Sequence, residues 1–364
     1  MSSDFETLWN DGEFHLSRSA KAGASCPVLV LTSAVDQPAP TSSARLEHAY
    51  DLRSELDPSW AARPLELIHD HGKPALVIED HGGEVLARLL GKPWELDLFL
   101  RVAIGITAAL GRLHQRGLFH RDIKPANVFV NTSSGEAWLS GFGLASPLPR
   151  ERQMPEPPET IVGTLAYMAP EQTGRTNRSI DSRSDLYSLG VTLYQLLTGS
   201  LPFTASDPMV WVHSHIARRP VPPSERLDNI PIAVSQIIMR LLAKTAEERY
   251  QTATGLESDL RRCLAEWEAH RHVIEVPLGQ HDTPDRLLIP EKLYGRGREV
   301  DALLAAFDRV VKGGAPELVL VSGYSGIGKS SVVNELHMVV APLRGLFASG
   351  KFDQYKREIG RAHV

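Results

Sequence analysis

The stretch that decides the fold of this chain is His120-Arg121-Asp122-Ile123-Lys124-Pro125-Ala126-Asn127. It places a carboxylate, an amine and an amide within one short loop. Asp122 is spaced to accept a proton from a hydroxyl group, Lys124 to neutralise charge on a terminal phosphate, and Asn127 to hold a metal ion on nucleotide phosphates. Because phosphoryl transfer depends on positioning and charge neutralisation more than on covalent chemistry, these residues predict a phosphate-transfer site.

Three further motifs follow in order. They are Gly163-Thr164-Leu165-Ala166-Tyr167-Met168-Ala169-Pro170-Glu171, Ser184-Asp185-Leu186-Tyr187-Ser188-Leu189-Gly190, and Arg249 within Glu247-Glu248-Arg249-Tyr250-Gln251. Before residue 81, turn signals and β-rich runs such as Val28–Thr32 predict a sheet-rich unit. After Gly82-Gly83, helical periods predict long helices at Leu96–Gln115 and Asp185–Leu197.

With these motifs, the chain resembles the Ser/Thr protein kinase family over roughly residues 5–268. The resemblance implies an α+β, two-lobe protein kinase-like fold. Residues 1–270 would form the kinase-like domain, with 1–80 as the small β-rich lobe and 81–270 as the large helical lobe. It makes Asp122 and Lys124 catalytic and Asn127 a metal and cofactor ligand. It also implies a Glu171–Arg249 ion pair, and an Asp185 that holds the His120-Arg121 turn.

Several residues depart from the family pattern. Gly141-Phe142-Gly143 stands where the family has Asp-Phe-Gly, so the principal metal carboxylate is missing. Val28–Thr32 lacks the lysine of the third strand, and the phosphate-covering loop is reduced to Asn10-Asp11-Gly12. Glu47 stands where the helix glutamate belongs. Lys21 or Arg18 could reach inward and replace the lysine, although exposed hairpin positions are the simpler expectation for both.

Two hypotheses follow from this pattern. The first is a Ser/Thr protein kinase-like signalling domain that binds ATP and transfers phosphate slowly. The second is a pseudokinase, a regulatory or docking module that controls a neighbouring ATPase. Loss of a metal ligand and of a phosphate-binding cation removes several kcal/mol of transition-state stabilisation each, and about 1.4 kcal/mol is a tenfold change in rate. Impaired or absent catalysis is therefore favoured.

A second nucleotide motif lies near the C-terminal end. Gly323-Tyr324-Ser325-Gly326-Ile327-Gly328-Lys329-Ser330 satisfies the phosphate-loop pattern G-x-x-x-x-G-K-[ST]. A strand is expected at Leu318–Ser322, and a helix at Ser331–Val340. Gly323, Gly326 and Gly328 would let the backbone cradle phosphates, Lys329 would reach the β- and γ-phosphates, and Ser330 would ligate Mg²⁺. The expected cofactors are thus ATP and Mg²⁺.

Upstream, Tyr294-Gly295-Arg296-Gly297-Arg298-Glu299 resembles the box that opens AAA-like signal-transducing (STAND) ATPases. The order of units resembles bacterial sensors that join a Ser/Thr kinase, an ATPase, a GAF domain and a sensor histidine kinase of two-component systems. Residues 271–290 are predicted to be a linker, and 291–364 the start of an α/β P-loop NTPase domain. With about 35 residues after Lys329, that domain is expected to be truncated, since such domains need well over 100 residues.

Composition narrows the partners. The net charge is −5 with both signs interspersed, which argues against a nucleic-acid surface. Two distant cysteines, Cys26 and Cys263, fit a reducing cytoplasm, and no apolar run approaches the ~20 residues of a membrane span. The predicted partners are ATP and a protein substrate or docking partner, in the cytoplasm.

Overall fold

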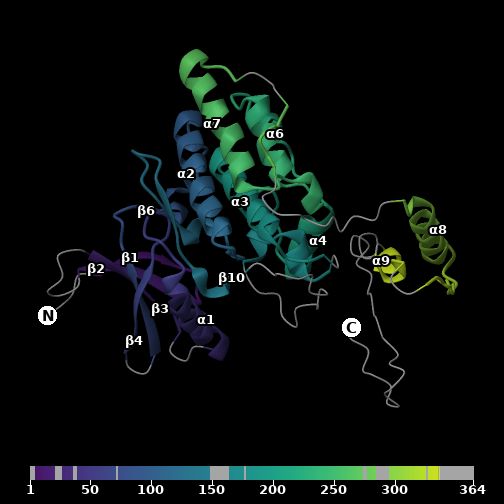
Figure 1. Cartoon of the computed structure of the whole chain (residues 1–364), viewed down its shortest axis with the longest axis horizontal. Helices are drawn as coiled ribbons and strands as arrows, with labels where there is room; N and C mark the ends of the chain where they lie inside the picture. Colours follow the sequence, from purple (N-terminus) through teal and green to yellow (C-terminus); the bar gives the residue numbers. More distant parts are fainter. Residues whose placement is uncertain are drawn as a thin grey trace.

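The protein kinase-like part of the chain has two lobes, a small one built on a sheet and a large one built from helices (Figure 1). The computed structural model describes residues 5–20, 27–35, 39–70, 73–147, 164–175, 178–273, 277–283, 295–324, 327–334 and 336. The small lobe comes first in the chain and the helices follow it. The predicted α+β, two-lobe fold is therefore confirmed.

The small lobe is a five-stranded antiparallel sheet with one helix against it. Its strands are β1 Phe5–Asn10, β2 Phe14–Ala20, β3 Pro27–Ser33, β4 Pro64–Asp70 and β5 Lys73–Glu79, in the spatial order β1-β2-β3-β5-β4. The helix is α1 Pro40–Asp51, followed by the 3-10 turn η1 Leu52–Ser54. Leu29 and Leu31 alternate inward from β3, and Leu46 and Ala49 of α1 are buried with them in one apolar cluster.

The large lobe is helical, with short strands beside the interlobe cleft. Its helices are α2 Leu96–Gln115, α3 Ser182–Thr198, α4 Pro208–Ala217, α5 Pro223–Arg226, α6 Ile232–Leu241 and α7 Ala253–His270. Its strands are β6 Glu84–Val85, β7 Leu118–Phe119, β8 Val128–Val130, β9 Ala137–Leu139 and β10 Ser146–Pro147. The 3-10 turns are η2 Leu86–Leu89, η3 Pro125–Asn127, η4 Phe142–Leu144, η5 Leu165–Tyr167, η6 Pro170–Thr173 and η7 Ala246–Glu248.

Helix α3 shows how local chemistry sets a boundary. The sequence period predicted 185–197, and the helix begins three residues earlier because the Asp181 carboxylate accepts a hydrogen bond from the Arg183 amide at 2.8 Å. It ends at Gly199, whose φ of 75° suits a left-handed C-cap. For α2, the predicted and observed bounds are the same.

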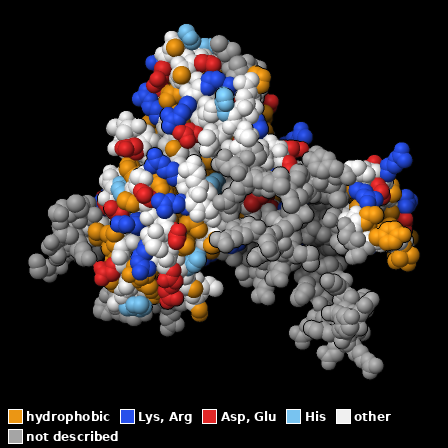
Figure 2. All heavy atoms as spheres, in the orientation of Figure 1, with side chains coloured by type: hydrophobic (Ala, Val, Ile, Leu, Met, Phe, Trp, Pro, Cys, Tyr) orange, Lys and Arg blue, Asp and Glu red, His pale blue; other side chains and the backbone are white. Residues whose placement is uncertain are grey.

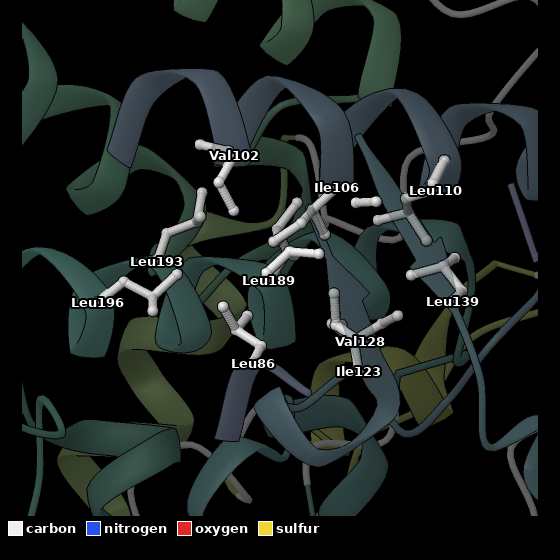
Figure 3. Packing of buried hydrophobic residues seen from close by; sticks show 14 of the residues in the cluster. Leu86, Val102, Ile106, Leu110, Ile123, Val128, Leu139, Leu189, Leu193 and Leu196 are labelled. Carbon is white, nitrogen blue, oxygen red and sulfur yellow. The ribbon is translucent and has the colours of Figure 1, made fainter. Parts of the chain in front are cut away.

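The core of the large lobe reaches the loop that the sequence singled out. Figure 3 shows Val102, Ile106 and Leu110 of α2 in the same apolar cluster as Leu189 and Leu193 of α3. Ile123, within the catalytic loop, and Val128, directly after it, belong to this cluster and are fully buried (Figure 3). The loop is thus anchored by apolar packing at its middle and at its C-terminal end.

Residues 277–283, within the predicted linker, contact the large lobe. The buried Asp282 carboxylate accepts hydrogen bonds from the amides of Gln251 and Thr252 at 2.8 and 2.9 Å. The Gly279 amide donates to Asp259 at 2.7 Å. The predicted boundaries at 270 and 290 stay predictions.

In the C-terminal unit the structure describes two helices, α8 Gly297–Gly313 and α9 Lys329–Asn334. The strand predicted at Leu318–Ser322 is wrong: these residues have no regular structure, and Leu318 and Leu320 are 87% exposed. A strand exists only when its backbone groups bond to a neighbour, and no described strand adjoins this segment. Of the predicted helix Ser331–Val340, residues 331–334 lie in α9, and 335 and 337–340 lie outside the described residues.

The visible surface carries no large single-sign patch. Figure 2 shows Lys and Arg side chains interspersed with Asp and Glu on this face of the kinase-like part. Among the described residues, we find no helix that combines the length and the apolar character needed to cross a bilayer.

Candidate functional site

The catalytic loop connects β7 to η3 and is held by a buried carboxylate. The Asp185 carboxylate of α3 accepts hydrogen bonds from the backbone amides of His120 and Arg121, each at 2.8 Å. Arg121 has a φ of 68°, which is a strained conformation for a side chain other than glycine. Gln172 fixes the same peptide from the other side by donating to the Arg121 carbonyl at 2.8 Å. The role that the resemblance gave to Asp185 is confirmed.

His120 lies under this loop as a neutral side chain. Burial holds the pKa of His120 below its usual value, even though Asp185 and Asp122 are near. Its Nε2 contacts the Ser140 carbonyl at 2.8 Å, and its Nδ1 accepts from the Asp122 amide at 3.3 Å. Since a carbonyl can only accept, the ring carries its proton on Nε2 and ties the loop to the segment after β9.

The predicted catalytic residues lie together at the mouth of the large lobe. The Lys124 Nζ is 3.2 Å from the Asp122 Oδ2 and donates to the Thr164 Oγ1 at 2.8 Å. The Thr164 hydroxyl lies 3.4 Å from the Asp122 Oδ1. The Asn127 Nδ2 donates to the Asp122 carbonyl at 2.8 Å and to its Oδ2 at 3.0 Å. The structure therefore brings a carboxylate, an amine and a threonine hydroxyl into contact.

Gly141 occupies the position of the missing metal carboxylate. Its φ is 77°, and a Cβ built on it would lie 2.4 Å from Asn127 Cγ and 2.5 Å from Asn127 Oδ1. The side chain of Asn127 thus fills the space that an aspartate at 141 would need. The glycine at 141 leaves room for the side chain of Asn127, whose amide turns toward Asp122.

The third strand supplies no cation to the cleft. Leu31, and not Thr32, lines the cleft, and Thr32 directs its hydroxyl to the His15 carbonyl at 3.4 Å. Leu31 therefore stands at the place of the missing lysine. Glu47 on α1 is exposed to solvent.

Arg18, one of the two cations that could have replaced the lysine, is paired outside the described lining of the cleft. Arg18 donates to Asp80 at 2.6 and 3.2 Å and to the Gly83 carbonyl at 2.7 Å, so it joins β2 to the segment between the lobes. Lys21 lies outside the described residues. Besides Lys124, the described lining of the cleft includes a second cation, Arg45 of α1, which sequence reasoning missed.

Arg45 pairs with an acid from the β1–β2 turn. Its Nη1 donates to both oxygens of Glu13, at 3.1 and 3.0 Å, and Ser42 adds a hydroxyl to Glu13 at 2.8 Å. The helix therefore supplies the cation and the strand region the acid, the reverse of the family's usual arrangement. A charged residue five places after Pro40, the first residue of α1, was the available signal, but the helical period does not show how α1 is positioned on the sheet.

The interlobe cleft measures about 700 Å³ together with its opening to solvent. Its walls are largely apolar, with Leu16, Leu31 and Ile78 from the small lobe and Phe142 from the large one. Such a cleft can take a flat, weakly polar group. The charged groups at its open end are Asp11, Glu13, Arg45, Asp122 and Lys124.

A magnesium site of the usual kind does not fit this cleft. Mg²⁺ takes six oxygen ligands, with one or two carboxylates joined by phosphates and waters. Here the Asp122 carboxylate is bonded to Lys124 and Asn127, and Gly141 brings none. Among the described residues there is also no cluster of three acidic, histidine or cysteine side chains that could hold a metal.

The ion pair predicted between Glu171 and Arg249 is confirmed. Its two N–O distances are 2.6 and 2.9 Å, and both side chains are buried. Burial alone would raise the pKa of Glu171, but Arg249 and the Ser184 hydroxyl hold it below its usual value. The pair joins η6 to the segment before α7.

The phosphate-loop residues are described in part. Lys329 opens α9, and its Nζ donates to the carbonyls of Gly323 and Tyr324 at 2.9 and 2.8 Å. Gly328 has a φ of 91°, which glycine adopts readily. Gly326 and the side chain of Ser330 lie outside the described residues. The lysine therefore folds back onto the described part of the loop, while the strand expected before the loop is not formed at residues 318–322.

Comparisons with known proteins agree with the two-lobe fold. A model of the protein kinase domain matches residues 61–260, more than half of the chain. The chain belongs to the protein kinase domain family. A model of the AAA ATPase domain matches residues 292–363. The kinase match begins after the β1–β2 turn and β3, where the family's glycine loop and phosphate-binding lysine are absent.

The relatives of this kinase-family chain are larger proteins. "Serine/threonine-protein kinase PknB" of Mycobacterium leprae is 33% identical over 191 residues, which is 52% of this chain and 30% of that protein. "Serine/threonine-protein kinase Pkn1" of Myxococcus xanthus is 37% identical over 198 residues, 53% of this chain and 28% of that protein. "Hybrid signal transduction histidine kinase G" of Dictyostelium discoideum is 29% identical over 350 aligned residues, which cover 72% of this chain and 10% of that protein. The chain thus spans less than a third of the length of each.

The two domain matches indicate the general chemistry of the chain. The chain has a Ser/Thr protein kinase-like domain joined to an AAA ATPase domain, and these two families in general use ATP with a divalent metal. Protein kinases also act on protein substrates.

Proposed function

We propose that the kinase-like domain is a regulatory pseudokinase module that controls the adjacent P-loop ATPase in bacterial signal transduction. The observation that carries the proposal is Gly141, with the side chain of Asn127 in the space that a metal-binding aspartate would fill. The leucine at position 31 supports it, because no lysine from that strand can hold the α- and β-phosphates.

The expected loss of rate is large. If a metal contact and a phosphate-binding lysine each contribute about 3 kcal/mol at the transition state, losing both slows transfer by roughly 10⁴-fold. Kinases typically turn over at about 1–100 s⁻¹, so this domain would fall below about 0.01 s⁻¹. Asp122, Lys124 and Thr164 then serve as a rigid docking face for a protein segment.

Slow phosphotransfer is the second candidate function. It is favoured by one observation, the contact of Thr164 and Lys124 with the Asp122 carboxylate at 3.4 and 3.2 Å. A substrate hydroxyl placed there would meet its proton acceptor without rearrangement.

ATP and Mg²⁺ use is proposed for the second unit. Gly323, Gly326 and Gly328 would surround the phosphates, Lys329 would leave the loop carbonyls for them, and Ser330 would ligate Mg²⁺. By analogy with the sensors that share this order of units, the chain would work with GAF and histidine kinase domains, as in two-component signalling in the cytoplasm.

The test measures transfer and binding with the 364-residue chain. Labelled ATP is supplied with Mg²⁺ or Mn²⁺ to the unaltered chain, Asp122→Asn and Lys329→Ala, and phosphate on the chain and on a generic basic protein is counted. We expect no transfer that depends on Asp122, and loss of most metal-dependent ATP binding in Lys329→Ala. Asp122-dependent transfer at about 1 s⁻¹ or faster would refute the regulatory proposal.

A further inference from the structure

The β1–β2 turn, Asn10 to Phe14, uses up its own hydrogen-bond donors. The Asn10 carboxamide accepts from the Gly12 amide at 2.8 Å. The Asp11 Oδ1 accepts from the amides of Glu13 and Phe14 at 3.0 and 2.8 Å. Backbone amides of a glycine-rich loop bind phosphate only when they are free to point at it, so this turn offers a phosphate no donors from these three positions.

The acids of the turn also take up cations at the open end of the cleft. The Asp11 Oδ2 lies 3.9 Å from the Lys124 Nζ, across the two lobes. Glu13 holds Arg45 through both of its oxygens, at 3.0 and 3.1 Å. Both cations that line the described cleft therefore face carboxylates of the same turn.

A nucleoside triphosphate would have to displace these carboxylates from Lys124 and Arg45. Its terminal phosphates would bring further negative charge to Asp11 and Glu13, with no metal carboxylate at 141 to hold a compensating ion. The neutral part of the cleft remains open, since Leu16 and Ile78 line apolar walls. The Trp9 indole N–H, also in the lining, is buried without a hydrogen-bond partner in the described part of the chain. This offers a ligand an apolar slot and a neutral donor.

We infer that Asp11 and Glu13 are specificity-determining residues of this cleft. Their carboxylates occupy the cations that would otherwise bind phosphates, so the cleft selects an uncharged nucleoside-like ligand over a nucleoside triphosphate. The inference rests on the proposed regulatory function of the same cleft. It names the ligand class that such a module would sense, and it assigns the selection to two carboxylates.

The test compares the affinities of four ligands that carry zero, one, two or three phosphates, and this series is called the ladder. Adenosine, AMP, ADP and ATP are titrated calorimetrically, without metal, into Lys329→Ala, which disables the second nucleotide site. In this background we expect ATP to bind no tighter than adenosine. Asp11→Asn and Glu13→Gln keep the hydrogen-bond acceptors of the turn and remove the charges. Each should tighten ATP about fivefold, as expected for a partly exposed charge pair, and leave adenosine unchanged.

Matched controls remove exposed carboxylates of the large lobe that do not line the described cleft. Asp97→Asn and Glu268→Gln each remove a partner of Arg101 on the large lobe and should leave all four affinities within about twofold. The inference is overturned if ATP binds the Lys329→Ala chain more than tenfold tighter than adenosine. It is equally overturned if the turn variants do not change the ladder, or if none of the four ligands binds to any variant.

The two proposals fail in different measurements. Rapid Asp122-dependent transfer would refute the regulatory function whatever the ladder shows. A steep ladder in the unaltered turn would refute the role of Asp11 and Glu13, even if no phosphate is ever transferred.

Discussion

Restoring an aspartate at position 141 should not restore phosphotransfer. The substitution Gly141→Asp adds the carboxylate that the family pattern has, but its Cβ would lie 2.4 Å from Asn127 Cγ. Asn127 must therefore rotate away and give up its hydrogen bond to the Asp122 carboxylate, 3.0 Å long. The backbone at 141, with φ of 77°, adds strain for any side chain.

The magnitude can be built from these two parts. A single non-glycine residue in the left-handed region costs roughly 1 kcal/mol. Losing a hydrogen bond to a charged group costs roughly 1.5–3 kcal/mol, so the total is about 3 kcal/mol. For a domain of this size that is a fall in melting temperature of roughly 6–12 °C.

Gly82→Asp is the matched control. Gly82 has a φ of 75°, and a Cβ there would meet nothing within 4 Å. It therefore carries the backbone strain without the overlap and should lose about 1 kcal/mol. Thermal and urea unfolding of both variants, with labelled phosphate transfer in Mg²⁺ and Mn²⁺, complete the assay. The reasoning fails if Gly141→Asp is as stable as Gly82→Asp, or if it transfers phosphate at about 1 s⁻¹.

Three further predictions concern buried charges. Glu171→Gln leaves Arg249 buried without its carboxylate and should cost about 3–5 kcal/mol in urea unfolding, against less than about 1 kcal/mol for Glu257→Gln in a partly exposed helix pair. Because Arg249 holds the pKa of Glu171 below its usual value, this stabilisation is lost as pH falls through that lowered pKa, and the variant should show a flatter stability profile in acid. Burial lowers the pKa of Lys244 to about 7 in the folded chain. Between that pH and about 10.4, the usual lysine pKa, this side chain is therefore protonated in the unfolded chain and mostly neutral in the folded one. Stability from this group rises with pH across that window, and Lys244→Met should remove the rise. Asp282→Asn weakens the acceptor of two backbone amides and should speed hydrogen exchange at residues 277–283 at least about tenfold, and unchanged exchange would contradict the prediction.

The parts of the fold with strong periods could be predicted from the sequence. The bounds of α2 were predicted to the residue because its apolar face is regular over five turns. Strand β4 was not predicted, because it lies at the edge of the sheet with Leu65 and Ile68 exposed, so its apolar residues do not alternate. The strand at 318–322 was predicted from apolar content alone, which cannot supply the neighbouring strand that it needs.

The placement of Asp122, Lys124 and Asn127 side by side could also be predicted, because they lie within one loop of eight residues, and their catalytic and metal-binding roles stay predictions. What the sequence could not show is how side chains distant in the chain meet. Asn127 and Gly141 are 14 positions apart, and only their packing reveals that one fills the place of the other. Arg45 and Glu13 belong to a helix and a turn whose relative register depends on the whole small lobe.

The departures of this cleft from the kinase pattern are consistent with one another in charge. A site for ATP and a metal needs cations for the phosphates and a carboxylate for the metal. This cleft lacks the lysine at Leu31 and the carboxylate at Gly141, and its cations Arg45 and Lys124 face acids of the β1–β2 turn. Restoring any one element would leave an unbalanced charge, because a new carboxylate would find no metal and a new lysine would compete for paired acids. Single reversions should therefore weaken the domain without reviving it, and a return to catalysis would require the turn, the third strand and position 141 to change together.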